Sequence, residues 1–403
     1  MATDPLTQAR DAFLRGLQAL NSGDPTGAEA LFAQALALAP GRISVMQNLG
    51  ITRVMLGRHA EAEALLLAAV DAEPQELGAW RALAQAQMEL GRIEAACLSV
   101  ERCLALGEDS AAIRARYGQC LARLGRRAEA VLAYEAAVLK DPGLSDALVE
   151  LGNLHREAGQ HTQAAACFQR ALASGGNPEL ITYLLGAVSE PRDGKVVPPS
   201  TTYVRQLFDE YAEEFDHHLV DQLAYQGHRL LLERLPPQAG PRYARVLDLG
   251  CGTGLCGLHV RHHAGRLVGV DLSPGMVEKA RQRGIYDALH VADVHAYLSS
   301  CQEAFDLVLA ADVFIYVGEL EGVLQGLAGC MPAGSWLAFT VEAAPPQGPG
   351  VQLLPSLRYA HSSTYLQDLA ARHGYSVVAM LDDTIRHDQQ RPVPGRYVYL
   401  QRR

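Results

Sequence analysis

The feature that most constrains this chain is a 34-residue repeat that runs through its first half. Small residues recur at this spacing, and the two clearest registers hold Gly23, Gly57, Gly91, Gly125, Gly159 and Ala28, Ala62, Ala96, Ala130, Ala164. A third register holds Gly16, Gly50, Ala84, Gly118 and Gly152. Larger side chains occupy a fourth: Phe32, Leu66, Val100, Tyr134 and Phe168. A fixed period of this length predicts a stack of similar helical units rather than one globular core.

Each unit is expected to be a pair of antiparallel helices, with small residues where the two helices approach closely. The glycine of the first register should end the first helix, because only glycine adopts the left-handed conformation there at little cost. Asp24 followed by Pro25 predicts the start of a helix, with a capping side chain and a proline in the first turn.

This pattern resembles the tetratricopeptide repeat family over residues 9–176. Pro40, Pro74 and Pro142 close three of the five units, whereas Glu108 and Gly176 depart from the pattern. A further helix over 178–188 is expected to cap the last apolar face of the array. The resemblance implies an α-helical solenoid over 9–188 whose concave groove holds a peptide or protein. A spacer or oligomerisation module is the alternative.

Residues 189–200 show neither helical nor strand periodicity and contain prolines at 191, 198 and 199. This composition predicts a linker between two domains. The second domain would then cover residues 201–403.

The second half contains a glycine-rich turn that is a candidate ligand-binding site. A short apolar strand runs to Gly250, the turn continues through Gly254, and a helix is expected from about Leu255. Such a turn lets a ligand approach the backbone at a helix N-terminus. Asp271, at the end of the next strand, can accept both hydrogens of a ribose diol. Leu255 stands where a dinucleotide-binding turn would have its third glycine, which argues against NAD.

Five segments in order resemble the motifs of class I methyltransferases. They read VLDLGCGTG (246–254), GVDLSPGMVEKA (269–280), HVAD (290–293), FDLVLAADVFIY (305–316) and GSWLAFT (334–340). The resemblance implies a Rossmann-like α/β domain with a seven-stranded sheet, helices on both faces, and S-adenosyl-L-methionine as cofactor. The fold class is therefore α + α/β, and the whole chain resembles bacterial methyltransferases that carry tetratricopeptide repeats.

The resemblance also implies which residues bind the cofactor. The glycine turn would hold the methionine part, Asp271 the ribose and Asp293 the adenine. Residues 203–219 resemble the aromatic cap helix of quinone-biosynthesis methyltransferases, which folds over the cofactor. The implied contacts are Asp248, Gly250, Cys251, Gly252, Gly254, Asp271, Leu272, Met276, Asp293, Val294, Ala310 and Tyr211. A helix N-cap or loop carboxylate is the plainer interpretation of each acid.

Candidate catalytic residues are His361, Tyr316 and His217. A sulfonium methyl is already electrophilic, so positioning is the main requirement, and a base is needed only if the acceptor must lose a proton. His217 and its neighbour His218 point in different directions on a helix, so no shared metal is expected. A structural role is the alternative for each histidine. Arg386 would either hold an anionic acceptor or form a surface salt bridge.

Composition argues against several classes of function and location. A formal net charge of −10 argues against a nucleic acid substrate. Eight cysteines without a CxxC pair predict reduced core residues and no metal site. The first residues lack a signal-like segment, and no apolar run is long enough for a membrane helix, so a cytoplasmic protein is expected.

The sequence therefore predicts methyl transfer to a small-molecule acceptor, on oxygen or nitrogen, with a carboxylate or hydroxyl as candidate groups. The repeats would serve assembly or partner docking. One alternative is a protein methyltransferase whose repeat groove presents the target chain. A second is a non-catalytic interaction scaffold. No Asn-Pro-Pro-Tyr or Pro-Cys follows the segment at 305–316, which argues against methylation of base amines, glutamine or cytosine C5.

Overall fold

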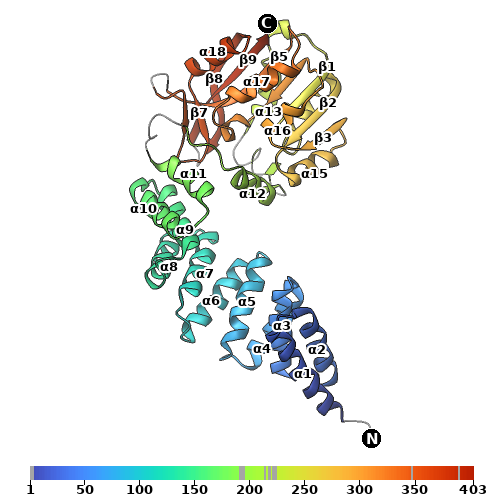
Figure 1. The fold of residues 1–403 in the computed structure, drawn as a ribbon, viewed down its shortest axis with the longest axis vertical. Helices are drawn as coiled ribbons and strands as arrows, with labels where there is room; N and C mark the ends of the chain where they lie inside the picture. Colours follow the sequence, from blue (N-terminus) through green and yellow to red (C-terminus); the bar gives the residue numbers. More distant parts are fainter. Residues whose placement is uncertain are drawn as a thin grey trace. The chain divides into compact units, whose positions relative to one another are not determined.

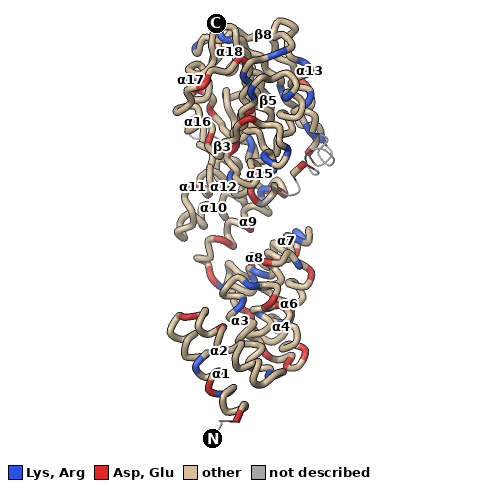
Figure 2. Tube along the Cα trace, turned by 90° about the vertical axis from the view of Figure 1, so that its right-hand side faces the viewer, with Lys and Arg blue, Asp and Glu red and all other residues tan. Residues whose placement is uncertain are grey.

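The chain folds into two compact units, shown in the computed structural model of Figure 1. They cover Met1–Gly176 and Asn177–Arg403. The structure describes residues 4–189, 196–212, 215–216, 219, 225–345, 348–388 and 391–403. In both units, basic and acidic positions are interspersed along the chain (Figure 2). Across the described residues, no helix combines the length and the apolar character needed to cross a membrane.

The first unit is a helical solenoid, as the repeat predicts. Its described part contains ten α-helices that pack as consecutive pairs. They are α1 (Pro5–Asn21), α2 (Pro25–Leu38), α3 (Ile43–Met55), α4 (His59–Ala72), α5 (Leu77–Glu89), α6 (Ile93–Ala105), α7 (Ala111–Arg123), α8 (Arg127–Lys140), α9 (Ser145–Glu157) and α10 (His161–Ala173).

The glycines of the first register have the conformation expected of them. Their φ angles lie between +71° and +79°, in the left-handed region, just after the first helix of each pair. Asp24 caps α2 as predicted, because its Oδ1 accepts a hydrogen bond of 2.8 Å from the Gly27 amide. The sequence thus encodes each turn locally.

The third and fourth registers meet inside each helix pair. A Cβ placed on Gly16 would lie 2.6 Å from the Phe32 ring, and one on Gly152 would lie 2.5 Å from the Phe168 ring. Both phenylalanines are fully buried. Glycine therefore allows the first helix to pack directly on the aromatic ring of the second.

We predict that Gly152→Ala destabilises the first unit by about 1–3 kcal/mol, the usual cost of forcing an extra methyl group into a packed core. Gly78→Ala is the matched control, since a Cβ there would have its nearest neighbour at 3.5 Å, at an ordinary helical position in α5. Urea unfolding followed by circular dichroism measures both. Equal midpoints for the two variants would contradict this account of the packing.

Helix α11 (Pro178–Val188) forms where the sequence predicts a capping helix, but it belongs to the second unit. Tyr183 of α11 is fully buried, and its hydroxyl donates a hydrogen bond of 2.5 Å to the Leu357 carbonyl. Its ring packs against those of Tyr203 and Tyr359. The contacts of α11 therefore group it with the second unit, and the domain boundary over 189–200 stays a prediction. Residues 190–195, inside the predicted linker, lie outside the described residues.

The second unit is built on one mixed sheet. Its strands are β1 (Tyr243–Leu249), β2 (Ala264–Asp271), β3 (Ala288–Val291), β4 (Leu307–Ala310), β5 (Trp336–Ala343), β6 (Val351–Leu353), β7 (Tyr359–His361), β8 (Tyr375–Asp388) and β9 (Arg391–Arg402). Seven of them follow the order β3-β2-β1-β4-β5-β9-β8, in which β9 runs antiparallel to both neighbours. The expected seven strands are joined by two short ones, β6 and β7, which extend the sheet from the end of β5.

Helices cover both faces of this sheet (Figure 1). One face packs against α16 (Val294–Ser300), α17 (Glu321–Cys330) and α18 (Ser363–Arg372). The other face packs against α13 (Gly227–Glu233) and α14 (Leu255–Val260). Within β1, Val246 and Leu247 point to opposite faces, and both are fully buried. Burial on both sides explains the continuous apolar runs of the central strands.

The strand order sets the place of the site. β1 pairs in parallel with β2 on one side and with β4 on the other. The carboxyl ends of these three strands therefore meet at one edge of the sheet, where ligands bind in open α/β sheets. Helix α12 (Thr201–Tyr211) and α15 (Pro274–Gln282) pack against each other in this unit.

Candidate functional site

The glycine turn between β1 and α14 forms the floor of the site. Gly250, Gly252 and Gly254 all have positive φ angles, of 69°, 54° and 96°. A Cβ on Gly250 would lie 2.4 Å from Val313, so the turn lies directly against the segment after β4. At Gly252 the nearest atom would be 3.9 Å away, which leaves the backbone open to a ligand.

Asp271 joins the turn to the next strand and helix. Its Oδ2 accepts a hydrogen bond of 2.8 Å from the Gly252 amide, and its Oδ1 accepts one of 2.9 Å from the Ser273 amide. Burial raises the pKa of Asp271, and the backbone amides oppose this effect. Each oxygen still has a lone pair for a further donor. The carboxylate is thus held rigidly while it keeps capacity for a diol.

Asp248 lies beneath the turn and is almost fully buried. Burial raises its pKa to about 7, and a 2.6 Å hydrogen bond from the Tyr286 hydroxyl opposes the rise. Tyr286 also fills the space beside Gly254 and Gly257, where a Cβ would lie 3.1 Å and 2.3 Å from the ring or its hydroxyl. The glycines after the turn therefore make room for the partner of Asp248.

Asp293 caps a helix, which is one of the two roles that the sequence allows for it. It is the N-cap of α16, because its Oδ1 accepts hydrogen bonds from the His295 and Ala296 amides at 2.8 Å and 3.2 Å. It also faces the same cavity as Asp271. A contact between Asp293 and adenine stays a prediction.

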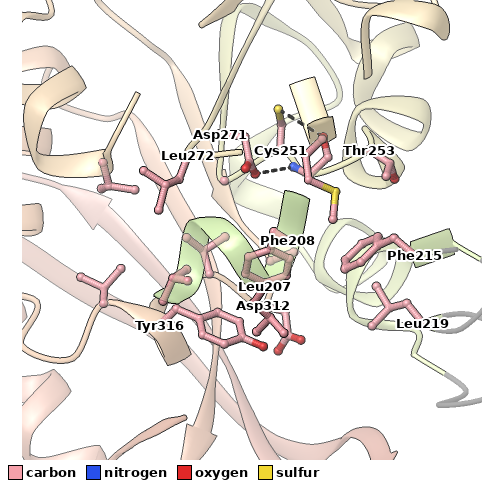
Figure 3. A pocket seen from close by; sticks show the side chains of 18 of the residues that line it. Leu207, Phe208, Phe215, Leu219, Cys251, Thr253, Asp271, Leu272, Asp312 and Tyr316 are labelled. Carbon is pink, nitrogen blue, oxygen red and sulfur yellow. Dashed lines mark hydrogen bonds between the residues drawn. The ribbon is translucent and has the colours of Figure 1, made fainter. Parts of the chain in front are cut away.

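These groups line one cavity of about 610 Å³ (Figure 3). Most of the predicted site residues are brought together in its wall: Asp248, Gly250, Cys251, Gly252, Asp271, Leu272, Met276, Asp293, Val294, Tyr211 and Tyr316. In the view of Figure 3, Asp271 and Cys251 lie on one side of the cavity, and Asp312 and Tyr316 lie on the other.

Three predicted residues do not line this cavity. Gly254 caps α14 instead, and Ala310 is fully buried at the end of β4. His361 is fully buried on β7, where its Nε2 lies 2.6 Å from the Gly318 carbonyl oxygen. Burial lowers the pKa of His361 to about 4. This placement fits the structural alternative for His361. His217 and His218 lie outside the described residues.

An aromatic wall closes the other half of the cavity. Phe208 packs edge-on against Tyr316 at 5.1 Å between ring centroids, and Tyr211 packs edge-on against Phe215 at 5.7 Å. Asp209 ties α12 to the start of α15, since it accepts hydrogen bonds from the Ser273 hydroxyl at 2.5 Å and the Gly275 amide at 3.2 Å. The helix that carries the aromatic side chains is thereby fixed next to Asp271.

A charged cluster lines the same half and includes residues to which the sequence assigned no role. Asp312 has a φ of 60°, unusual for a residue other than glycine. Its amide donates to the Thr340 hydroxyl at 2.8 Å, and its carboxylate accepts from Arg386 Nη1 at 2.7 and 2.9 Å. Arg386 also pairs with Glu342, whose pKa is raised by burial, an effect that Arg386 opposes. Arg386 is only 1% exposed, so the expectation of a surface salt bridge is wrong.

Arg358, Tyr225 and His228 also line the cavity. Arg358 follows the short strand β6 and lies next to β7, strands that the sequence did not predict. Burial lowers the pKa of His228 to about 4. All three residues lie outside the five motifs, so the spacing of the motifs gave no signal by which they could be found.

The fold and the cavity define a repeat protein joined to a doubly covered α/β domain with a nucleotide-type site. Residues 246–334 match the family described as a methyltransferase domain. Residues 19–86, 81–145 and 149–194 match tetratricopeptide repeat families. The chain carries tetratricopeptide repeats followed by a class I methyltransferase domain.

Individual proteins align with part of the chain. Malonyl-[acyl-carrier protein] O-methyltransferase of Enterobacter lignolyticus (strain SCF1) is 32% identical over 164 residues, which are 40% of this chain and 60% of that protein. Trans-aconitate 2-methyltransferase of Mycobacterium sp. (strain KMS) is 40% identical over 113 residues, 28% of this chain and 42% of that protein. The chain thus spans less than two thirds of the length of either relative.

Among solved structures, N-methyltransferase NodS from Bradyrhizobium japonicum WM9, in complex with S-adenosyl-L-homocysteine, aligns with 49% of this chain and 97% of its own. The identity is 18% and the TM-score 0.40.

The protonation of Asp248 makes a testable contribution to stability. Its folded pKa of about 7 lies above its ordinary value, so the folded state keeps a proton that the unfolded state releases. This contribution is complete near pH 4 and is lost as the pH rises through 7. We predict that Asp248→Asn gains stability relative to the wild type between pH 4 and pH 8. Thermal unfolding across this range measures the difference, and a pH-independent difference would contradict the assignment.

Proposed function

We propose that this protein transfers the methyl group of S-adenosyl-L-methionine to a small-molecule acceptor, on oxygen or nitrogen. The observation that carries the proposal is the single cavity in which the glycine turn and Asp271 share one wall with an aromatic second half. Its volume of about 610 Å³ lies within the range of roughly 300–1,000 Å³ for small-ligand pockets. An aromatic cavity of this size favours a small molecule over a protein chain.

The half of the cavity that contains the glycine turn and Asp271 fits this cofactor, and we call it the cofactor half. The open backbone at Gly252 leaves space beside the turn, and Asp271 has lone pairs for the two ribose hydroxyls. When bound, the cofactor supplies an electrophilic methyl group on a sulfonium. The chain has to hold the acceptor in line and exclude water. The aromatic side chains of α12, fixed by Asp209, are placed to exclude that water.

The proposed acceptor needs no general base in the cavity if it reacts as an anion. Of the predicted bases within the described residues, His361 lies outside the cavity wall. Tyr316 lines the wall and is proposed as an acceptor contact. The names of two relatives refer to O-methylation of a malonyl group and methylation of trans-aconitate, both carboxylic acids. This supports an oxygen acceptor.

Docking of a peptide or protein partner to the repeats stays a prediction from the sequence, as does the cytoplasmic location.

Calorimetric titration with S-adenosyl-L-methionine and with NAD tests the proposal. Asp271→Ala should weaken S-adenosyl-L-methionine binding at least about tenfold, because hydrogen bonds to a charged group contribute about 1.5–3 kcal/mol. Asp271→Asn keeps one acceptor oxygen for the backbone amides and should also bind more weakly. Asp368→Ala is the control, since Asp368 is exposed on α18. Binding of NAD alone, or equal affinities for all variants, would overturn the proposal.

A further inference from the structure

We call the half of the cavity lined by Phe208, Asp312 and Tyr316 the acceptor half, and two arginines in different states also line it. Arg386 is fully buried and shared between two carboxylates, because Nη1 contacts both oxygens of Asp312 and Nη2 contacts Glu342. Its positive charge is therefore fully used within the protein. Arg386 holds the Asp312 carboxylate through both of its oxygens, and it offsets negative charge that would otherwise repel an anion.

Arg358 is held only weakly. Its Nε donates to the Tyr316 hydroxyl at 3.3 Å, and its Nη1 lies 3.4 Å from a carboxylate oxygen of Asp388. Both distances are at the long end for hydrogen bonds, whereas arginine and carboxylate in a good pair lie 2.7–2.9 Å apart. Asp388 is about half exposed, so solvent screens its charge. Arg358 can therefore exchange Asp388 for a better-placed anion in the cavity.

Two further donors in the same wall lack a protein partner. The Tyr225 hydroxyl and Arg386 Nε are buried, and neither has a hydrogen-bond partner among the described residues. Tyr225 is 3% exposed, and its hydroxyl folds back over Gly227, where a Cβ would lie 2.7 Å away. A buried donor without a partner carries a free-energy cost, because it has lost its hydrogen bonds to water. An oxygen of a bound acceptor would remove this cost, whereas a protonated amine would not.

The charges in this half also distinguish the acceptor classes. Arg358 and Arg386 balance the buried Asp312 and Glu342, and the charge of Asp388 beside Arg358 is screened because Asp388 is about half exposed. A cationic acceptor therefore gains little attraction from these groups. The sulfonium would repel it. An anion gains attraction from the sulfonium and a direct partner in Arg358.

Building on the proposed function, we propose that the acceptor is a carboxylic acid, bound as its carboxylate against Arg358, with the Tyr225 hydroxyl donating to an acceptor oxygen. A carboxylate oxygen forms the new bond to the methyl carbon while the bond between that carbon and sulfur breaks. The electron pair of the broken bond stays on sulfur. No proton has to leave, so the step uses none of the titratable side chains of the cavity wall as a base. The product is a methyl ester.

The experiment uses the full chain and cofactor with a radioactive methyl group. The probes are trans-aconitate, malonyl thioesters and aromatic carboxylic acids, each tested beside its primary amide and the matching amine. Mild alkali releases methanol from methyl esters but not from methyl ethers or methylamines. We expect transfer to carboxylic acids only, with the label recovered as volatile methanol. Alkali-stable product from amines or hydroxyl compounds would overturn the inference and leave the proposed function intact.

If no methyl transfer is detected, binding measurements decide between failure of the inference and failure of the proposed function. With S-adenosyl-L-homocysteine present, calorimetry should show binding of at least one acid and none of its amide. Cofactor binding without any such preference for acids overturns the inference alone. Absence of cofactor binding overturns the proposed function itself.

Variants then test the residues. Arg358→Met should raise KM for the acid at least about tenfold, the loss of one charged hydrogen bond, with the affinity for S-adenosyl-L-methionine unchanged. Arg358→Lys should restore part of the loss, and Tyr225→Phe should raise KM less. Arg372→Met is the control, since Arg372 is exposed on α18 and pairs with Glu321. If Arg358→Met and the control have the same KM, or if Arg358→Met changes only the melting temperature, Arg358 is not the acceptor-binding residue.

Discussion

The site of this protein depends on the two hydrogen bonds that Asp271 accepts from the Gly252 and Ser273 amides. They connect the turn after β1, the end of β2 and the start of α15. Asp209 extends the connection to α12 through the Ser273 hydroxyl. One partly buried carboxylate therefore fixes the floor of the cavity and the helix that carries its aromatic wall. Backbone amides offset part of the cost of desolvating this charge and orient the carboxylate before any ligand arrives.

The parts of the structure that the sequence predicts well are those encoded locally. Each of the five glycines of the first register lies in a left-handed turn because the 34-residue period repeats the same helix end. The motif residues from Asp248 to Asp293 meet at one edge of the sheet because parallel strands place their carboxyl ends together. For such features, spacing along the chain is sufficient.

Other features depend on contacts between distant segments, and the sequence does not reveal them. Arg358, between β6 and β7, and Tyr225, two residues before α13, face the same cavity although they are far apart in the sequence. His361 looks like a catalytic residue in the sequence, yet β7 places it in the interior against Gly318. Helix α11 has the caps of an ordinary helix, and only the burial of Tyr183 assigns it to the second unit. The Arg386 pairs with Asp312 and Glu342 likewise join residues far apart in sequence.

We assign the two halves of one cavity to the cofactor and to the acceptor. A crystal structure of the full chain with S-adenosyl-L-homocysteine tests this division most directly. We expect Asp271 to contact the ribose hydroxyls and the backbone of Gly250 to Gly252 to contact the amino acid part. We expect the sulfur to face the half lined by Tyr316 and Arg358. A ribose away from Asp271, or a sulfur that faces away from Tyr316 and Arg358, would contradict this division.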